Sequence, residues 1–208
     1  MTAANDLLAF TAAAALLTIL PGLDTALVIR TSVIDGTRAA ARAGAGIVLG
    51  CLAWGVAVAL GASALIGASA VGFSVLRWIG AAYLLWLGIG LLRSNGGRAD
   101  VSMGMEAPGR STAWLRRGLL TNLLNPKVGL FYLSFLPQFV PSGVPAASWM
   151  LLLACVHAML GAAWFTVLIV AGRSIGRALA RPGVLRSIDR ATGLLFVSFG
   201  LRLALARR

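Results

Sequence analysis

The composition of this chain is that of a membrane protein. Of its 208 residues, 59% are hydrophobic and only 12% are charged, whereas a soluble domain carries about 25% charged residues, so an ordinary globular domain is excluded. The net charge of +12 does not indicate a nucleic-acid partner. The arginines lie between apolar segments, as in the short cytoplasmic loops of membrane proteins, and no soluble basic domain is available to hold a duplex.

Six apolar segments are long enough to cross a bilayer, which requires about 20 residues. Residues 43–76 and 128–172 contain no Asp, Glu, Lys or Arg, and each stretch has room for two spans and a turn. The N-terminal segment does not resemble a signal peptide, because no basic residues precede its apolar stretch. In chain order, we predict transmembrane helices at residues 7–29, 43–66, 73–92, 118–138, 147–171 and 188–206.

The connectors between these segments are of two kinds. Those at 67–72 and 141–145 are uncharged, and their glycines and prolines are typical of tight turns. The other three are rich in arginine, and because basic loops remain in the cytoplasm, we expect the N-terminus outside a bacterial inner membrane. The three basic connectors hold 13 of the 18 basic residues: Arg30, Arg38, Arg42, Arg93, Arg98, Arg110, Arg116, Arg117, Arg173, Arg177, Arg181, Arg186 and Arg190.

The C-terminus opposes this orientation. Arg202, Arg207 and Arg208 lie in it, yet an even number of spans places it outside. A five-span alternative, in which residues 188–206 lie in the membrane interface, would bring these arginines into the cytoplasm.

A short internal repeat favours the sixth span. Residues 77–83 and 190–196 each carry an arginine, a glycine and an aromatic residue in the same register. The third predicted helix therefore matches the sixth, and three is an odd number, so the two halves must have opposite orientations, as in many secondary transporters. We predict one transporter domain over 1–208 with a 3+3 inverted-topology repeat, made of a first half (about 1–92), a cytoplasmic connector (about 93–117) and a second half (about 118–208).

Two predicted helices contain residues that a bilayer normally excludes. A proline removes a hydrogen-bond donor and frees a carbonyl one turn earlier, and at membrane depth such groups must be buried in protein or face a wet cavity. Interrupted helices at corresponding positions of two halves are the best sequence indication of a transporter's binding site, so we place the transport pathway here. The residues are Pro21, Gly22 and Asp24 in the first helix, and Asn122, Asn125, Pro126 and Lys127 in the fourth.

Asp24 and Lys127 are expected at comparable depths. Asp24 lies six residues from Arg30 and Lys127 lies ten from Arg117, hence about 9 Å and about 15 Å deep at a rise of 1.5 Å per residue. A charge at the bilayer centre costs about 3 kcal/mol, so such residues pair or line a pathway. We interpret both as pathway residues. The alternatives are a purely structural Asp24–Lys127 pair and an Asp24 side chain that extends toward the inner interface.

Other polar and aromatic residues admit more than one interpretation. His157, the only histidine, suits proton coupling, although a hydrogen bond between helices is the simpler reading and is preferred. Gln138 is interpreted as a cap or rim residue. Trp54, Trp86 and Trp164 are deeper than the usual aromatic belt, and we interpret them as packing residues, with cavity lining as the alternative.

Gly46 and Gly50 form a GxxxG motif, which lets helices approach closely. Packing within one bundle is its simplest interpretation, and an interface in a homo-oligomer is the alternative. No catalytic triad, metal cluster, phosphate-binding glycine loop or ATPase motif occurs in the sequence. We therefore predict neither an enzyme nor a cofactor, and infer transport driven by an ion gradient.

At these residues the chain resembles the lysine-exporter (LysE/RhtB) family of bacterial amino-acid exporters, over nearly its whole length. Residues 125–139 resemble the family's Asn-Pro-Lys…Leu-Pro-Gln-Phe segment, and residues 21–24 resemble its Pro-Gly-Pro-Asp element. Gly46 and Gly50 fit its glycine-rich second helix. Leu23 replaces a proline of the family pattern, which predicts a milder break in the first helix, and Trp54 replaces a smaller or polar residue, which predicts a reshaped pocket.

The resemblance implies export of amino acids or close derivatives, driven by the proton motive force, with an amino acid and protons as partners. Efflux of a metal cation or another toxic solute is the alternative within transport, disfavoured by the lack of Cys, His and carboxylate clusters. A membrane scaffold without transport activity is the alternative outside it, and it would tolerate substitution of Asp24 and Lys127.

Overall fold

The computed structural model describes residues 3–68, 70–93, 111–179 and 181–205, and every regular element in these ranges is helical. The predicted all-α class is therefore confirmed. The elements are, in chain order, α1 (Ala3–Ile19), α2 (Leu23–Ile34), α3 (Thr37–Ala68), α4 (Ala70–Arg93), α5 (Ser111–Leu123), α6 (Pro126–Phe135), the 3-10 helix η1 (Leu136–Phe139), α7 (Ala146–Leu179) and α8 (Pro182–Leu205).

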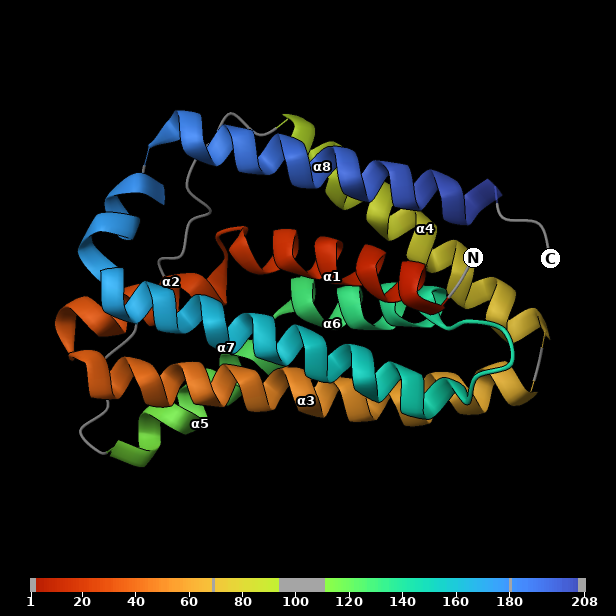
Figure 1. Cartoon of the computed structure of the whole chain (residues 1–208), viewed down its shortest axis with the longest axis horizontal. Helices are drawn as coiled ribbons and strands as arrows, with labels where there is room; N and C mark the ends of the chain where they lie inside the picture. Colours follow the sequence, from red (N-terminus) through yellow and green to blue (C-terminus); the bar gives the residue numbers. More distant parts are fainter. Residues whose placement is uncertain (1–2, 69, 94–110, 180, 206–208) are drawn as a thin grey trace.

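The helices differ from the predicted segments mainly at their ends. α3 begins before the apolar stretch, because the alanines and arginines of residues 38–42 are strong helix formers. The turn expected at 67–72 is shorter than predicted: α3 continues to Ala68, α4 begins at Ala70, and the two helices run in opposite directions in Figure 1, while residue 69 lies outside the described residues. The turn at 141–145 is confirmed and contains Gly143 with a φ of 82°. Most of the basic connector at 93–117, including Arg98 and Arg110, lies outside the described residues.

Length and composition identify the helices best suited to a bilayer. Within the described ranges, Thr37–Gly61 of α3 and Ala146–Ala171 of α7 are long and apolar enough to cross one. α1 and α2 meet the same requirement together, as a pair bent by 50° at a short break. The described part thus has two such helices, or three if the bent pair is one span.

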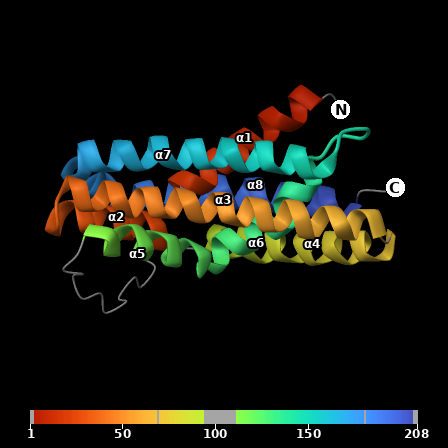
Figure 2. The same ribbon diagram turned by 90° about the horizontal axis from the view of Figure 1, so that it is seen from below.

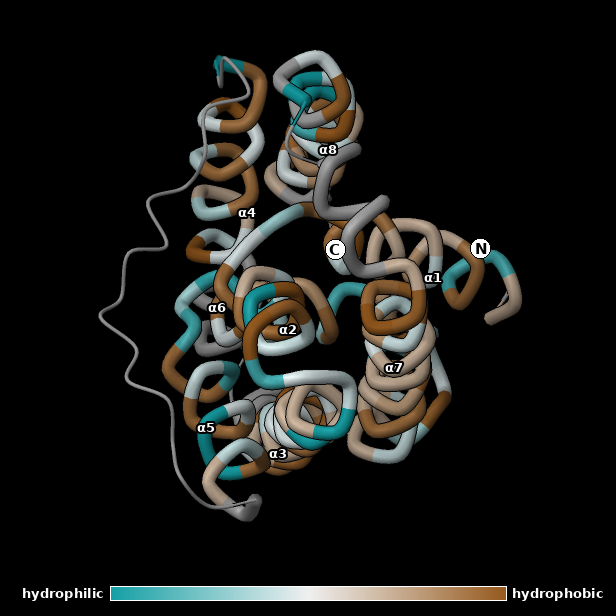
Figure 3. Tube along the Cα trace, turned by 90° about the vertical axis from the view of Figure 1, so that its left-hand side faces the viewer, coloured by the Kyte–Doolittle hydropathy of each residue, from teal (hydrophilic) through white to brown (hydrophobic). Residues whose placement is uncertain are grey.

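The helices lie roughly along one long axis (Figure 1). α3 and α7 are side by side and run in opposite directions, and α4 and α8 pack together along one edge. α5 packs against α3 on the side away from α7, as the view from below shows (Figure 2). α2 lies between α3 and α7, and hydrophobic residues predominate along these helices in the end-on view (Figure 3).

The two halves of the chain have matching elements. Each consists of a broken helix (α1–α2, or α5–α6), a helix of more than 30 residues (α3 with 32, α7 with 34) and a helix of 24 residues (α4, α8). Corresponding helices run in opposite directions in Figure 1. The α2–α3 and α7–α8 junctions lie at the left of that view, whereas the start of α1, the end of α8 and the 141–145 turn lie at the right.

Glycines allow the backbones of α3 and α5 to touch. A Cβ added to Gly46 would lie 2.0 Å from the carbonyl oxygen of Leu115, and a Cβ added to Gly118 would lie 2.0 Å from that of Ala43. A Cβ at Gly50 would lie 2.6 Å from Oδ1 of Asn122. The GxxxG motif therefore serves packing within one bundle, as its simplest interpretation predicted, and it sets α3 directly against the second broken helix.

An aromatic cluster fixes α6 to α1. The ring of Phe10 in α1 lies 6.2 Å from the rings of both Phe131 and Phe135, and 5.7 Å from that of Phe139. All four side chains are buried. Buried aromatic pairs add about 0.5–1.5 kcal/mol each beyond the area that they bury, so this cluster holds the two broken helices together at one end of the bundle.

Candidate functional site

The two helix breaks place Asp24 and Lys127 at equivalent positions. Gly22 is the N-cap of α2 and Asn125 the N-cap of α6, so the two ionisable residues each lie two positions after a cap. Pro126 is the first residue of α6, where its missing N–H and fixed φ suit a helix start. In both halves, therefore, a charged side chain emerges from the first turn of the second helical piece.

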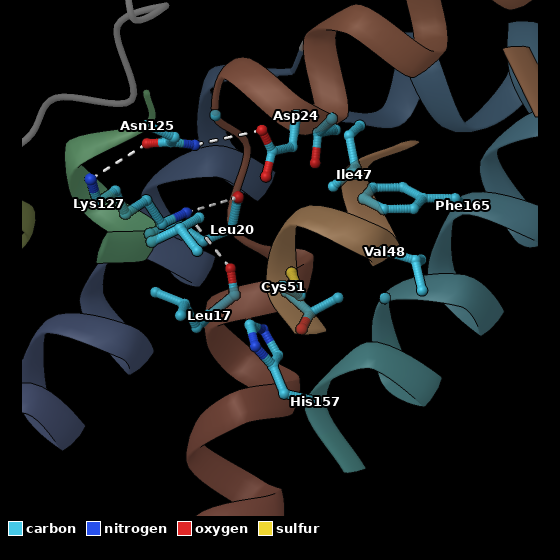
Figure 4. Close-up of a pocket in the computed structure, with 15 residues that line it drawn as sticks. Leu17, Leu20, Asp24, Ile47, Val48, Cys51, Asn125, Lys127, His157 and Phe165 are labelled. Atoms are coloured by element: carbon cyan, nitrogen blue, oxygen red, sulfur yellow. Dashed lines mark hydrogen bonds between the residues drawn. The ribbon is translucent and has the colours of Figure 1, made fainter. Parts of the chain in front are cut away.

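Asp24 is bound by the break in the other half. Nδ2 of Asn122 donates to one carboxylate oxygen at 2.8 Å. Nδ2 of Asn125 donates to the other at 3.3 Å, as Figure 4 shows. Asn125 also caps its own helix, since its Oδ1 accepts from the backbone N–H of Lys127 at 3.1 Å. Asp24 lies in the first turn of α2, where the helix dipole favours a negative charge.

Lys127 is bound, in turn, by the break in the first half. Its Nζ donates to the carbonyl oxygens of Leu17 at 3.3 Å and of Leu20 at 3.1 Å (Figure 4). No direct ion pair between Asp24 and Lys127 is among the contacts of the described residues. Asp24 and Lys127 interact electrostatically, and in addition two crossed contacts let each half hold the charge of the other.

Both charged residues line one cavity between the halves. Its volume is about 40 Å³, which exceeds the roughly 10–15 Å³ that one water needs but is far below the roughly 300–1,000 Å³ of typical ligand pockets. In this conformation the cavity has room for water but not for an amino acid. The lining residues are Leu17, Thr18, Leu20, Gly22, Asp24, Thr25, Ile47, Val48, Cys51, Asn125, Lys127, Val128, His157, Gly161 and Phe165.

His157 joins this cavity from α7. Its Nδ1 lies 3.0 Å from the hydroxyl oxygen of Tyr132 in α6, and both side chains are buried. The interhelical hydrogen bond that was the preferred interpretation is therefore present, while proton coupling stays a prediction. Cys51 of α3 belongs to the same polar group. Nδ2 of Asn122 lies 3.5 Å from the Cys51 sulfur, and the Cys51 thiol interacts with the Tyr132 side chain.

The prolines of the predicted site act through the backbone. Pro21 and Pro126 do not line the cavity, but each marks the point where a helix is interrupted. Leu23, which stands in place of a family proline, is the first residue of α2, and the pair still bends by 50°.

Trp86 and Trp54 lie in different environments. Trp86 is 71% exposed and stacks beside Tyr83, so it is neither a core packing residue nor a cavity-lining one, because α4 turns this face outward. Trp54 packs on Gly129 and lines a second cavity of about 150 Å³ beside the break at Asn125. Gln138 donates to the carbonyl of Ser134 one turn earlier, as a cap.

Three functional candidates were missed by sequence reasoning. Cys51 counts in the sequence only as a small apolar residue, and Tyr132 as one aromatic residue of an apolar helix. Asp189 is buried in α8 and interacts electrostatically with Lys127. Asp189 carried a usable signal, because an acidic residue at the start of a predicted span is rare.

Comparison with known proteins shows the family to which the chain belongs. The chain is 34% identical to the leucine efflux protein of Enterobacter sp. (strain 638) over 89% of each chain, and 31% identical to the homoserine/homoserine lactone efflux protein of Salmonella typhi over 92% of each. It is 28% identical to the uncharacterized membrane protein YrhP of Bacillus subtilis (strain 168), over 97% of this chain and 100% of that protein. No solved structure matches it. The family of LysE type translocators matches residues 15–207, and the chain, a membrane transport protein, belongs to that family.

Proposed function

We propose that this protein is a secondary exporter of amino acids or close derivatives, driven by the proton motive force across a bacterial inner membrane. Relatives named for leucine efflux and for homoserine and homoserine lactone efflux align with it over about nine-tenths of its length, which supports the substrate class. The absence of a nucleotide-binding motif from the sequence supports an ion gradient as the energy source.

The observation that carries the proposal is the meeting of opposite charges from two helix breaks in one cavity. An amino acid carries an ammonium and a carboxylate, so its site needs both signs of charge. Asp24 would receive the ammonium and Lys127 the carboxylate. Asn122 and Asn125 would orient Asp24, and His157, on the same cavity, is the candidate for proton transfer. Pro21, Gly22 and Pro126 would keep the two helices interrupted at the depth of the cavity.

We further propose six membrane crossings arranged as a 3+3 inverted repeat, with both chain ends outside the cell. The matched helix lengths and opposite directions of the two halves support the repeat. A reporter that is active only after translocation, fused after Arg208, is expected to be active. Activity of a cytoplasm-only reporter at the same position would support five crossings instead.

Transport by the purified protein in proteoliposomes tests the function. When a proton gradient is imposed, the protein is expected to transport radiolabelled L-leucine or L-homoserine without ATP. A panel of other amino acids, dipeptides and divalent metal ions defines the substrate class. Transport confined to metal ions would overturn the proposal in favour of the alternative, and equal transport after the gradient is collapsed would overturn the coupling.

A further inference from the structure

The C-terminal end of α1 presents two backbone carbonyls to the cavity. Pro21 has no N–H, so the carbonyl of Leu17, four residues earlier, lacks its helical donor. The carbonyl of Leu20 lies just beyond Ile19, the last residue of α1. An unsatisfied carbonyl is strongly destabilising at membrane depth, and the C-terminal end of a helix favours a positive charge. This end of α1 therefore requires a donor, preferably a cationic one.

Lys127 supplies that donor from the other half of the molecule. Its ammonium lies 3.3 Å from the Leu17 oxygen and 3.1 Å from the Leu20 oxygen. The position is not explained by its own helix, because Lys127 lies in the first turn of α6, where the dipole disfavours a cation. The break in α1 thus already holds a primary ammonium group, delivered on a side chain.

We propose that the carbonyls of Leu17 and Leu20, together with Asp24, form a binding site for a primary ammonium. In this structure Lys127 binds the two carbonyls without a direct ion pair to Asp24, and the ammonium of the substrate takes its place during transport and also reaches Asp24. The second step rests on the proposed function. An ammonium has three N–H donors, and the two carbonyls and the carboxylate, all on residues that line the same cavity, provide three acceptors.

The exchange explains how Lys127 can serve the substrate's carboxylate. To reach it, Lys127 must leave the two carbonyls, which would then lack donors. A substrate ammonium that enters beside Asp24 restores those hydrogen bonds and keeps the same charge at the end of α1. The site directly adjoins the first helix break, since a Cβ at Gly22 would lie 3.5 Å from Nζ of Lys127, an ordinary contact.

Methylammonium binding to Lys127→Ala tests the site without requiring transport. The substitution empties the site, so methylammonium is expected to raise the melting temperature of the purified variant and not that of the wild type, in which Lys127 competes. At ten times its dissociation constant, mass action predicts a rise of about 3–6 °C. Tetramethylammonium, which has the same charge but no N–H, is expected to have no effect. If Lys127→Ala is recovered folded only in the presence of methylammonium, that dependence supports the site equally.

A second variant tests the backbone carbonyl itself. In Lys127→Ala, the added substitution Pro21→Ala restores an N–H that can bond the Leu17 carbonyl, so the methylammonium effect is expected to decrease. Equal shifts in wild type and variant, equal shifts with tetramethylammonium, or an effect unchanged by Pro21→Ala would each overturn the ammonium site. Wild-type transport confined to metal ions would overturn the proposed function and leave this binding result standing.

Discussion

The backbone groups at the two helix breaks of this protein find their hydrogen-bond partners in different ways. The first, between Ile19 and Leu23, has a glycine N-cap that makes no side-chain hydrogen bond. The second, around Asn125, is capped by its own asparagine side chain, which accepts from the N–H of Lys127. The second break is therefore satisfied locally, whereas the first depends on a lysine more than 100 residues away.

This difference shows that a break need not be self-sufficient to persist in a membrane. At the second break, Oδ1 of Asn125 accepts a hydrogen bond from its own helix, and Nδ2 of Asn125 donates to Asp24. The first break provides the carboxylate and, through its carbonyls, a place for the ammonium of Lys127. The two breaks form one unit with crossed contacts, and substitutions that affect one partner are expected to affect both halves.

The largest effect is expected from substitution of the two charges. Asp24→Asn and Lys127→Ala should each abolish efflux while the protein still reaches the membrane. The double variant removes both opposite charges of the site, and replacing both members of a buried charged set is often nearly neutral for stability. We therefore expect the double variant to insert but to remain inactive, as measured by membrane abundance and by efflux of L-leucine.

Asp6→Asn is the matched control, because Asp6 lies in the first turn of α1, away from the cavity residues. It should leave efflux intact. Restored efflux in the double variant would show that the two charges only stabilise the bundle.

An intermediate effect is expected from the caps, and it tests the asymmetry directly. Asn125→Ala removes a side-chain cap, which costs about 0.5–2 kcal/mol, and it also removes a hydrogen bond to Asp24. Gly22→Ala is the control at the other break, because its cap makes no side-chain bond and the added methyl meets only ordinary contacts. Thermal unfolding in detergent should show a loss for the first variant and little change for the second. Equal losses would remove the distinction between the breaks.

The smallest effect is expected from a bond that stays within one half. Tyr132→Phe removes the hydroxyl that meets His157, and a hydrogen bond contributes about 0.5–1.5 kcal/mol. If this bond only joins α6 to α7, the variant should lose stability by that amount and keep the wild-type dependence of efflux on pH. A displaced pH profile would assign His157 to proton coupling. Phe131→Leu, on the neighbouring position of α6, provides a control for general loosening of the core.

The sequence predicted the site from residue types that are unusual in a membrane. It was less informative about contacts that depend on how the helices pack. Pro21 and Pro126 predicted both breaks, and Asp24, Asn125 and Lys127 were assigned to one site because they lie at these breaks, with the estimated depths of Asp24 and Lys127 in support. The crossed contacts were not predictable, because backbone carbonyls carry no residue signature and their alignment with Lys127 depends on packing between halves.

Helix ends and packing partners were the other limit. The turn expected at 67–72 is shorter than predicted, because the alanines and valine on either side of it are compatible with a helix and extend α3 to Ala68 and α4 back to Ala70. Gly46 and Gly50 were interpreted as packing residues, but only the structure identifies their partners, Leu115 and Asn122 of α5. Tyr132 and Asp189 were overlooked because neither lies beside a break.

The crossed contacts can form only after the second half of the chain has been synthesised. Leu20 and the lysine that binds its carbonyl are 107 residues apart in the chain, and ribosomes add about 5–20 residues per second. The first half therefore waits roughly 5–20 s in the membrane, with two carbonyls that only water or the insertion machinery can satisfy, until α6 is made. A nascent chain released before Lys127 would leave that end of α1 exposed, which makes truncated forms of this protein natural substrates for membrane quality control.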